Sequence, residues 1–302
     1  LGLSPLLAQL VPSPFDDPSN WVSIPFTEED GAAFVPADLA RSANPLGGSV
    51  RAIINDDGRT PMLSDRYPWS AIGRVDWVND RGDVVSACTG TLVGVDLVLT
   101  NAHCLIDEAT DEPTAYRLRF QPNLRRGRAD VSAQVVDYTY GDSPYTGLAA
   151  DDWALLRLNQ PLGDTYGYLG WRSLDFTDDA LVEETAGKVS IVGYAGDFPT
   201  ERLRNFGEPG ETAGLSDGCS VLLVVPDGDL ADTIIHDCDT NAGASGGPIL
   251  GQFDDGEHYI VGLHSGSITL LESITLPSGD STDILNRGVQ VQRWAETAAA
   301  LR

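Results

Sequence analysis

From about Ser49 onward, the sequence is built of short runs rich in β-branched residues, with turn-forming residues between them. The clearest runs are residues 84–87, 90–100, 154–158, 189–194, 220–225 and 259–263. Short strands at this spacing are typical of β-sandwiches and β-barrels, and the alternating helical segments that a parallel sheet needs are missing. The 32 Gly and 18 Pro also suit a chain with many turns better than a helical bundle. We therefore expect an all-β fold of antiparallel strands.

Both ends of the chain depart from this pattern. Residues 1–48 hold seven of the 18 prolines, six acidic residues and one basic residue, and they show no sustained helical or strand period. Such a segment is typical of a pro-segment, linker or extended arm rather than of a domain. At the other end, apolar residues step by three and four, which predicts an amphipathic helix that packs on the second half of the fold. These residues are Val291, Trp294, Ala298 and Leu301.

The charge of the chain excludes two classes of function. The 302 residues include 45 Asp and Glu against 19 Lys and Arg, a formal net charge of −26. Nucleic acid and anionic membrane surfaces repel such a chain. No apolar stretch approaches the about 20 residues that a membrane-spanning helix needs. We therefore expect neither nucleic acid nor a membrane as a partner, and the length allows one large domain or two modest ones.

Four cysteines indicate where the protein works. Cys88, Cys104, Cys219 and Cys238 form no CxxC pair, so a zinc or thioredoxin-like site has little support. Separations of 16 and 19 residues suit two local disulfides, although three pairings are possible. Disulfides form in oxidising compartments, so we expect a secreted or periplasmic protein. The acidic residues near Asp229 lack the spacing of an EF-hand loop, and we predict no metal or other cofactor.

Three short blocks hold residue types that act together in nucleophilic catalysis. A serine hydroxyl is a weak nucleophile, so Ser245 needs a base, which His103 can supply. A carboxylate must orient that imidazole and stabilise its charged form. We assign this role to Asp152 rather than to Asp151, because side chains alternate along the strand that follows. The blocks are Thr100-Asn101-Ala102-His103-Cys104, Asp151-Asp152-Trp153-Ala154-Leu155-Leu156-Arg157-Leu158 and Gly243-Ala244-Ser245-Gly246-Gly247-Pro248.

Glycine at 243 lets the backbone turn so that the amides of Gly243 and Ser245 converge on a developing oxyanion. Each block alone has an ordinary structural explanation, such as a turn or a strand cap. In the order His, Asp, Ser, they resemble the chymotrypsin-like (trypsin superfamily) serine peptidases. The resemblance covers roughly residue 66 to the C-terminus.

The resemblance implies a fold of two six-stranded antiparallel β-barrels with a peptide-binding cleft between them. The first barrel is expected over residues 49–165 with His103 and Asp152, and the second over 166–302 with Ser245, the specificity pocket and the terminal helix. The resemblance also implies the pairing Cys88–Cys104, which leaves Cys219–Cys238. It implies a monomeric endopeptidase that acts on polypeptides without a cofactor. A non-catalytic binding module on the same fold is the rival of another class.

The pocket for the residue before the scissile bond (P1) is formed in this superfamily just before the serine and on the strand after it. Asp239 stands where trypsin-like enzymes keep the carboxylate that binds Lys or Arg. His264 stands where glutamyl endopeptidases of the V8-like branch carry a histidine, which they pair with a hydroxyl residue, here Thr240. An imidazole and a hydroxyl can each donate to a P1 carboxylate, with charge assistance if His264 is protonated. With Ser265 and Ser267 in the same pocket, we favour cleavage after Glu, and cleavage after Lys or Arg through Asp239 is the alternative.

Two further features resemble the V8-like branch. Ala244 stands where trypsin-like zymogens have the Asp that pairs with a freed N-terminus, so that activation route is missing. Residues 49–73 resemble the start of mature bacterial glutamyl endopeptidases. We therefore expect residues 1–48 to be a pro-segment that an activating protease cuts between Gly48 and Ser49, and the new amino terminus to help bind the P1 acid. Of the remaining histidines, we expect His236 to be structural and His258 to be solvated.

Overall fold

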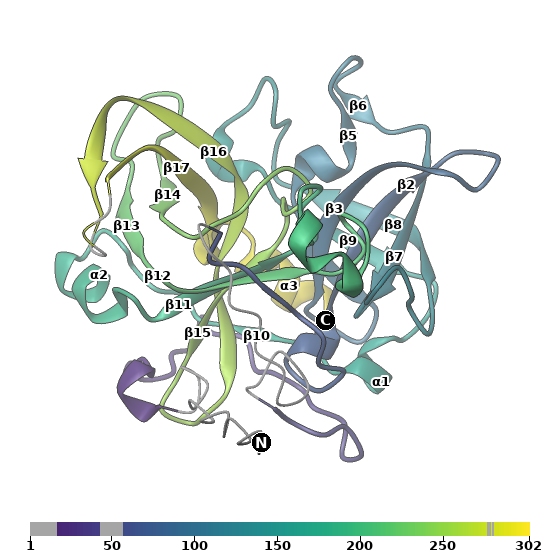
Figure 1. The fold of residues 1–302 in the computed structure, drawn as a ribbon, viewed down its shortest axis with the longest axis horizontal. Coiled ribbons are helices and arrows are strands. Elements are labelled where there is room, and N and C mark those ends of the chain that lie inside the picture. The colour runs from purple at the N-terminus through teal and green to yellow at the C-terminus, as the bar shows by residue number, and fades with distance from the viewer. Residues whose placement is uncertain (1–16, 43–56, 277–278, 280) are drawn as a thin grey trace, which may run out of the picture.

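The computed structural model describes residues 17–42, 57–276, 279 and 281–302. In these residues the chain is mostly β-structure, and its strands form two bodies that lie side by side (Figure 1). Three short α-helices occur in the described part, at α1 (Gly163–Tyr166), α2 (Asp179–Thr185) and α3 (Ala295–Leu301). The expected all-β fold is thereby confirmed.

The strands of the first body are β2 (Ile72–Val78), β3 (Val84–Leu92), β4 (Leu97–Thr100), β7 (Arg117–Pro122), β8 (Ala133–Tyr140) and β9 (Ala154–Leu158), with the small pair β5 (Ile106–Asp107) and β6 (Glu112–Pro113) beside them. The strands of the second body are β1 (Thr60–Pro61), β10 (Gly170–Trp171), β11 (Val189–Gly193), β12 (Gly214–Cys219), β13 (Val221–Val224), β14 (Thr233–His236), β15 (Pro248–Gln252), β16 (His258–Thr275) and β17 (Ser281–Gln290).

The first body is a closed antiparallel barrel in the order β2-β3-β4-β9-β8-β7. Strand β4 of this barrel is buried along its whole length, which explains the continuous apolar run before the His103 block. β4 pairs with β9, and Thr100 lies opposite Ala154. Because β4 ends just before His103 and β9 begins just after Asp152, this pairing brings the two residues to the same end of the barrel.

The second body pairs in the order β1-β12-β11-β15-β16-β17-β14-β13, and β10 runs parallel beside β16. Within the described residues this path is open, so hydrogen bonding does not close it into a ring as it closes the first barrel. β15 begins just after Ser245, and β16 carries His264. β1 comes from the chain before the first barrel and adds to β12 at the edge of this sheet.

An N-terminal arm, residues 17–42, runs along the second body (Figure 1). A buried ion pair joins Asp30 of the arm to Arg172, at 3.0 Å, with side chains 2% and 3% exposed. The guanidinium of Arg172 also lies over the rings of Phe26 and Phe253, at 4.9 Å and 4.3 Å. An unpaired charge at this depth costs several kcal/mol, roughly 3–5, so the arm and the sheet stabilise one another. The predicted cleavage point between Gly48 and Ser49 lies outside the described residues.

The C-terminal helix packs differently from our expectation. Arg157 on β9 donates to the carbonyl of Leu301 at 2.8 Å, and the guanidinium of Arg302 donates to the carbonyls of Val93 and Leu169. Trp294, just before α3, is fully buried in the core that includes the first barrel. The C-terminal segment therefore lies across the seam and contacts both bodies, since Trp294 also meets Trp171 of β10 edge-on at 5.3 Å, and our prediction that it packs on the second body describes only part of its packing. Helical spacing identifies the apolar face but does not say which element covers it.

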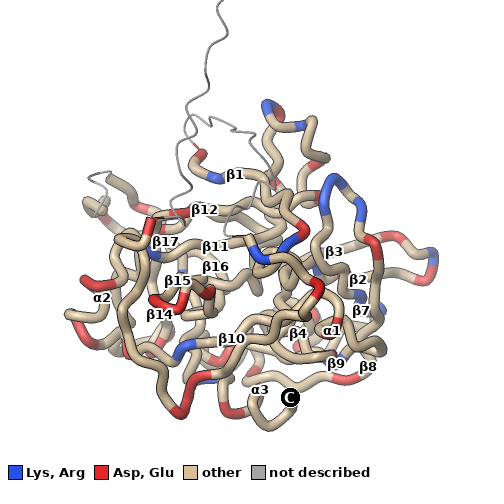
Figure 2. Tube along the Cα trace, turned by 90° about the horizontal axis from the view of Figure 1, so that it is seen from below, with Lys and Arg blue, Asp and Glu red and all other residues tan. Residues whose placement is uncertain are grey.

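Acidic residues are spread over the loops and strand ends of both bodies, with fewer Lys and Arg between them (Figure 2). Such a distribution favours solubility and repels anionic partners. Among the residues that the structure describes, no helix is long and apolar enough to cross a bilayer.

Candidate active site

His103 and Asp152 form the best-defined polar contact of the site. The Nδ1 atom of His103 lies 2.8 Å from Oδ2 of Asp152, and the backbone N–H of His103 donates to Oδ1 at 3.0 Å. The Asp152 side chain is 1% exposed, whereas that of His103 is 23% exposed. Asn101 donates to the carbonyl of Asp152 at 2.7 Å and fixes the backbone there. Because Nδ1 faces the carboxylate, the other ring nitrogen of His103 is left for a partner in the cleft.

The neighbouring carboxylate of Asp151 is used elsewhere. It pairs with the guanidinium of Arg293 at 3.2 Å and not with His103. Different partners for two adjacent side chains are what the alternation of side chains predicts. Of the two aspartates, Asp152 is the one that meets the imidazole.

Ser245 lies in a loop whose backbone conformation at residue 243 requires glycine. Gly243 has φ of +97°, and a Cβ atom there would lie 2.5 Å from the carbonyl oxygen of Tyr194. The first barrel fixes the same loop through Thr89 on β3. The backbone N–H of Thr89 donates to the carbonyl of Ser245 at 2.8 Å, and its hydroxyl donates to the carbonyl of Gly243 at 3.0 Å. His103, Gly243 and Ser245 thereby line one cleft of about 710 Å³.

Two disulfides fasten the segments beside this cleft. Cys88–Cys104 joins β3 to the turn Ala102–Cys104, which carries His103. Cys219–Cys238 joins the end of β12 to the chain just before Asp239. Both pairings are those that the resemblance implies, and they are confirmed. The two clusters of metal-binding residue types in the described part each contain one of these disulfides, whose sulfurs are bonded to each other.

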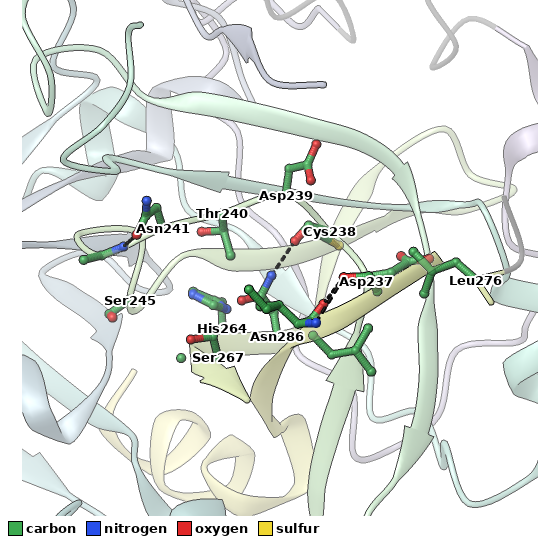
Figure 3. Close-up of a pocket in the computed structure, with 15 residues that line it drawn as sticks. Asp237, Cys238, Asp239, Thr240, Asn241, Ser245, His264, Ser267, Leu276 and Asn286 are labelled. Carbon is green, nitrogen blue, oxygen red and sulfur yellow. Dashed lines mark hydrogen bonds between the residues drawn. The ribbon is translucent and has the colours of Figure 1, made fainter. Parts of the chain in front are cut away.

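A second pocket, of about 800 Å³, opens beside Ser245 (Figure 3). Thr240, His264 and Ser267 face the same hollow in this view. The hydroxyl oxygen of Thr240 is buried and has no hydrogen-bond partner among the described residues. Ser265 does not join them, because its hydroxyl turns toward β17 and lies 3.5 Å from the carbonyl of Arg287.

Asp239 lines the same pocket, but its carboxylate is directed away from Ser245 and His264 (Figure 3). Oδ2 of Asp239 accepts a hydrogen bond from the backbone N–H of Gly58 at 3.1 Å. The trypsin-like alternative needs this carboxylate at the base of the pocket. In the structure it instead anchors the segment that precedes β1.

His264 has a second imidazole behind it. Nε2 of His236 lies 3.2 Å from Nδ1 of His264. The two rings therefore share one hydrogen bond, in which one of these nitrogens carries the proton. His264 is 3% exposed, and burial, followed by the nearby His236, lowers its pKa well below the usual value. Burial likewise lowers the pKa of His236 to about 3. His264 is therefore neutral in the free protein, and the charge assistance that the sequence analysis considered is not available until a ligand supplies an opposite charge.

His258 is not solvated, and our prediction for it is wrong. It is the first residue of β16, is 3% exposed and meets the ring of Trp69 edge-on at 5.6 Å. Burial lowers its pKa to about 4. The acidic turn before it lies at the surface, but the side chain of His258 points into the protein.

Several residues of the site carry no signal in the sequence. The outer part of the pocket is formed by the β16–β17 hairpin, with Asn286 donating to the carbonyl of Cys238 at 2.7 Å. No short motif marks these residues, because they come from the sides of a long hairpin. Arg59 was also missed, although it lies in the segment that resembles the start of mature glutamyl endopeptidases. The apolar wall of the hairpin consists of Leu276, Ile284 and Leu285.

A closed barrel beside a second antiparallel sheet, with a histidine–aspartate pair and a serine at their seam, defines the class of chymotrypsin-like serine peptidases. Residues 88–263 match the family model described as "Trypsin-like peptidase domain", and the chain belongs to this family. A glutamyl endopeptidase of Bacillus licheniformis is 28% identical over 160 residues, which cover 49% of this chain and 44% of that protein. The chain thus matches less than half the length of this relative.

Solved structures show the same fold. A Glu endopeptidase in complex with MPD has a TM-score of 0.58 at 23% identity and covers 82% of this chain and 100% of its own. The protease Anisep from Arthrobacter nicotinovorans has a TM-score of 0.52 at 21% identity, with 77% and 97% covered. These likenesses confirm the chymotrypsin-like fold. Two of the three relatives are named for glutamyl endopeptidase activity, in line with the V8-like branch that the sequence resembles.

Proposed function

We propose that this protein is a serine endopeptidase in which Ser245 is the nucleophile, His103 the general base and Asp152 the carboxylate that orients it. The observation that carries the proposal is the His103–Asp152 pair at 2.8 Å, whose ring shares one cleft with Ser245. Family membership supports the same activity.

The chemistry proceeds through an acyl-enzyme. The hydroxyl oxygen of Ser245 attacks the scissile carbonyl carbon while its proton passes to Nε2 of His103. The amides of Gly243 and Ser245 donate to the oxyanion, each contributing about 3 kcal/mol to the transition state. The C–N bond then breaks, and His103 returns the proton to the leaving amine. Water, deprotonated by the same imidazole, releases the acid and restores the serine.

Cleavage after Glu is the specificity that the pocket supports best. A P1 carboxylate needs hydrogen-bond donors, and Thr240 brings a buried hydroxyl without a partner in the described residues. Ser267 adds a second hydroxyl at the rim. Cleavage after Lys or Arg would need the carboxylate of Asp239, which is held by Gly58. The name of the relative from Bacillus licheniformis points the same way.

His264 would complete this pocket in a particular tautomer. When the proton between the two rings belongs to His236, Nε2 of His264 carries a hydrogen and can donate to the P1 acid. The negative charge of that acid favours the protonated imidazole and raises the pKa of His264 from its low value in the empty pocket. Binding of a Glu side chain is thus coupled to proton uptake.

Activation and location follow from the same proposal. A cut between Gly48 and Ser49 would place the new amino terminus only a short stretch of chain before Gly58, a span of at most roughly 30 Å when fully extended. Gly58 itself contacts Asp239 in the wall of the pocket. The freed terminus could therefore reach the P1 acid. Two disulfides suit secretion into an oxidising compartment.

Matched peptides that differ only at P1, with Glu, Gln, Arg, Lys or Phe, test the proposal. We expect wild type to cleave best after Glu and Ser245→Ala to lose about 10⁶-fold in kcat. Preference for Arg or Lys would transfer specificity to Asp239. Absence of cleavage by wild type, both as the full chain and after trimming to Ser49, would establish the binding module instead.

A further inference from the structure

Arg59 is a buried cation next to the active-site loop. Its side chain is 8% exposed, and its guanidinium binds two carboxylates at once. Nε and Nη2 donate to Asp57 at 2.8 Å and 2.7 Å, and Nη1 and Nη2 donate to Asp197 at 2.8 Å and 3.0 Å. A planar guanidinium that donates four hydrogen bonds in this way fixes both the distance and the orientation of the two carboxylates.

Asp197, the second of these carboxylates, also binds the loop before Ser245. Oδ2 of Asp197 also accepts from the side-chain amide of Asn241 at 2.8 Å. The adjacent backbone N–H of Gly196 donates to the carbonyl of Ala242 at 2.7 Å. Although burial alone would raise the pKa of Asp197, the hydrogen bonds from Arg59 and Asn241 hold it below its usual value, so this carboxylate stays charged.

Without Arg59 the same place would hold mutually repelling charges. The carboxylate of Asp239 lies close to this network, because it accepts from Gly58, the residue between Asp57 and Arg59. Two carboxylates, of Asp57 and Asp197, therefore meet at one guanidinium, and the carboxylate of Asp239 is one residue away through Gly58. Removal of the cation would push apart the two loops that they belong to.

The position directly before Ser245 cannot supply this order itself. Ala244 is 2% exposed and has no charge with which to bind a freed N-terminus. It belongs to a small apolar cluster, and the guanidinium of Arg59 lies over one ring of that cluster, Phe198, at 5.1 Å. The other members of the cluster are Ala195, Leu203 and Phe206.

We propose that Arg59 is a positioning residue that holds the loop of residues 239–245, and with it the oxyanion-hole amides, in working geometry. This inference rests on the proposed function and deepens it. Arg59 does the work that a freed N-terminus does in trypsin-like zymogens, but it does so from within the chain. Because Arg59 lies after the predicted cut, the network is the same before and after cleavage. Cutting then completes the P1 pocket without assembling the oxyanion hole.

The experiment compares Arg59→Ala with Arg204→Ala, an exposed arginine whose ion-pair partner among the described residues is Glu208, at 3.4 Å. The readouts are kcat and KM on the preferred peptide, and the rate at which a fluorophosphonate labels Ser245. For Arg59→Ala we expect kcat and labelling to fall about 100-fold with little change in KM, as a small misplacement of reacting groups does. Millimolar methylguanidinium should restore much of this loss, and Arg204→Ala should behave as wild type.

Each result bears on the inference. A folded Arg59→Ala protein that is labelled at the wild-type rate would overturn it, and so would labelling of wild type that appears only after cleavage. If Arg59→Ala does not fold, Asp197→Asn replaces it, since it keeps the shape but weakens the link to Arg59, and we expect a smaller loss in the same direction. Wild type that neither cleaves nor reacts would refute the proposed function itself, which separates the two failures.

Discussion

His103 and His264 each face one side chain at about hydrogen-bond distance. Because the two partners differ in charge, they suit the two histidines to different tasks. His103 in the first barrel faces the carboxylate of Asp152 at 2.8 Å, whereas His264 in the second sheet faces the imidazole of His236 at 3.2 Å. A carboxylate stabilises the charged ring, which the proposed role of His103 as general base requires. A neutral imidazole in a buried place gives no such support, and the pKa of His264 is lowered well below its usual value. The side chain that each imidazole faces therefore determines what that histidine can do.

Weakening the pair of His103 and Asp152 should lower the cleavage rate more than any other change considered below. Asp152→Asn should lower kcat about 10⁴-fold, because an amide no longer selects the required tautomer or stabilises the charged ring. The matched control is Asp151→Asn, which should change kcat less than about twofold since Asp151 pairs with Arg293. Peptide cleavage at saturating substrate measures both. Equal losses in the two variants would contradict the assignment of Asp152.

The second pair is weakened by His264→Gln. We expect kcat/KM for a Glu substrate to fall about 10–100-fold, as the loss of a hydrogen bond to a charged group predicts. Labelling of Ser245 by a fluorophosphonate should stay unchanged, because it does not use the P1 acid. A parallel loss of labelling would show that His264 supports the catalytic groups rather than specificity.

The pH dependence of cleavage tests the pair of His264 and His236 further. Because a bound Glu raises the pKa of His264, its binding takes up a proton. The ratio of kcat/KM for Glu over Gln substrates should therefore fall, by up to about tenfold per unit, as pH rises from the low pKa of His264 in the free protein to its raised pKa in the complex. Division by the Gln value removes the titration of His103, which both substrates share. A ratio that does not change with pH would mean that His264 stays neutral in the complex.

His258 should have a small effect on how stability depends on pH. Burial lowers the pKa of His258 to about 4, so the unfolded chain binds a proton below about pH 6.5 that the folded chain does not. Stability is thus complete above that pH and is lost toward pH 4, by about 1 kcal/mol per unit from this residue. Thermal unfolding at several pH values should show a weaker acid slope in His258→Gln than in wild type. An identical slope would indicate that His258 is charged in the folded protein.

The sequence predicts the parts of the site that lie in short motifs. Spacing and order identify His103 and Ser245, and alternation along β9 separates Asp152 from Asp151. The orientation of a strand's first residue is less visible, since His258 follows an acidic turn and is nevertheless buried.

Contacts between distant segments could not be predicted. Arg59 and Asp197 are 138 residues apart, and a single Arg and a single Asp leave no pattern at that distance. His236 and His264 lie on β14 and β16, which are separated by β17, so their meeting depends on the register of three strands. The packing of α3 depends in the same way on how the two bodies adjoin.

The buried pair of Asp30 and Arg172 has a consequence for the proposed cleavage. A cut between Gly48 and Ser49 breaks the backbone but leaves the arm on the sheet, where Arg172 also donates to the carbonyl of Ile24. Departure of the arm would strand a guanidinium that is 3% exposed. Processing would therefore yield a nicked, two-chain enzyme, whose short fragment travels with the long one through native purification and parts from it only in denaturant.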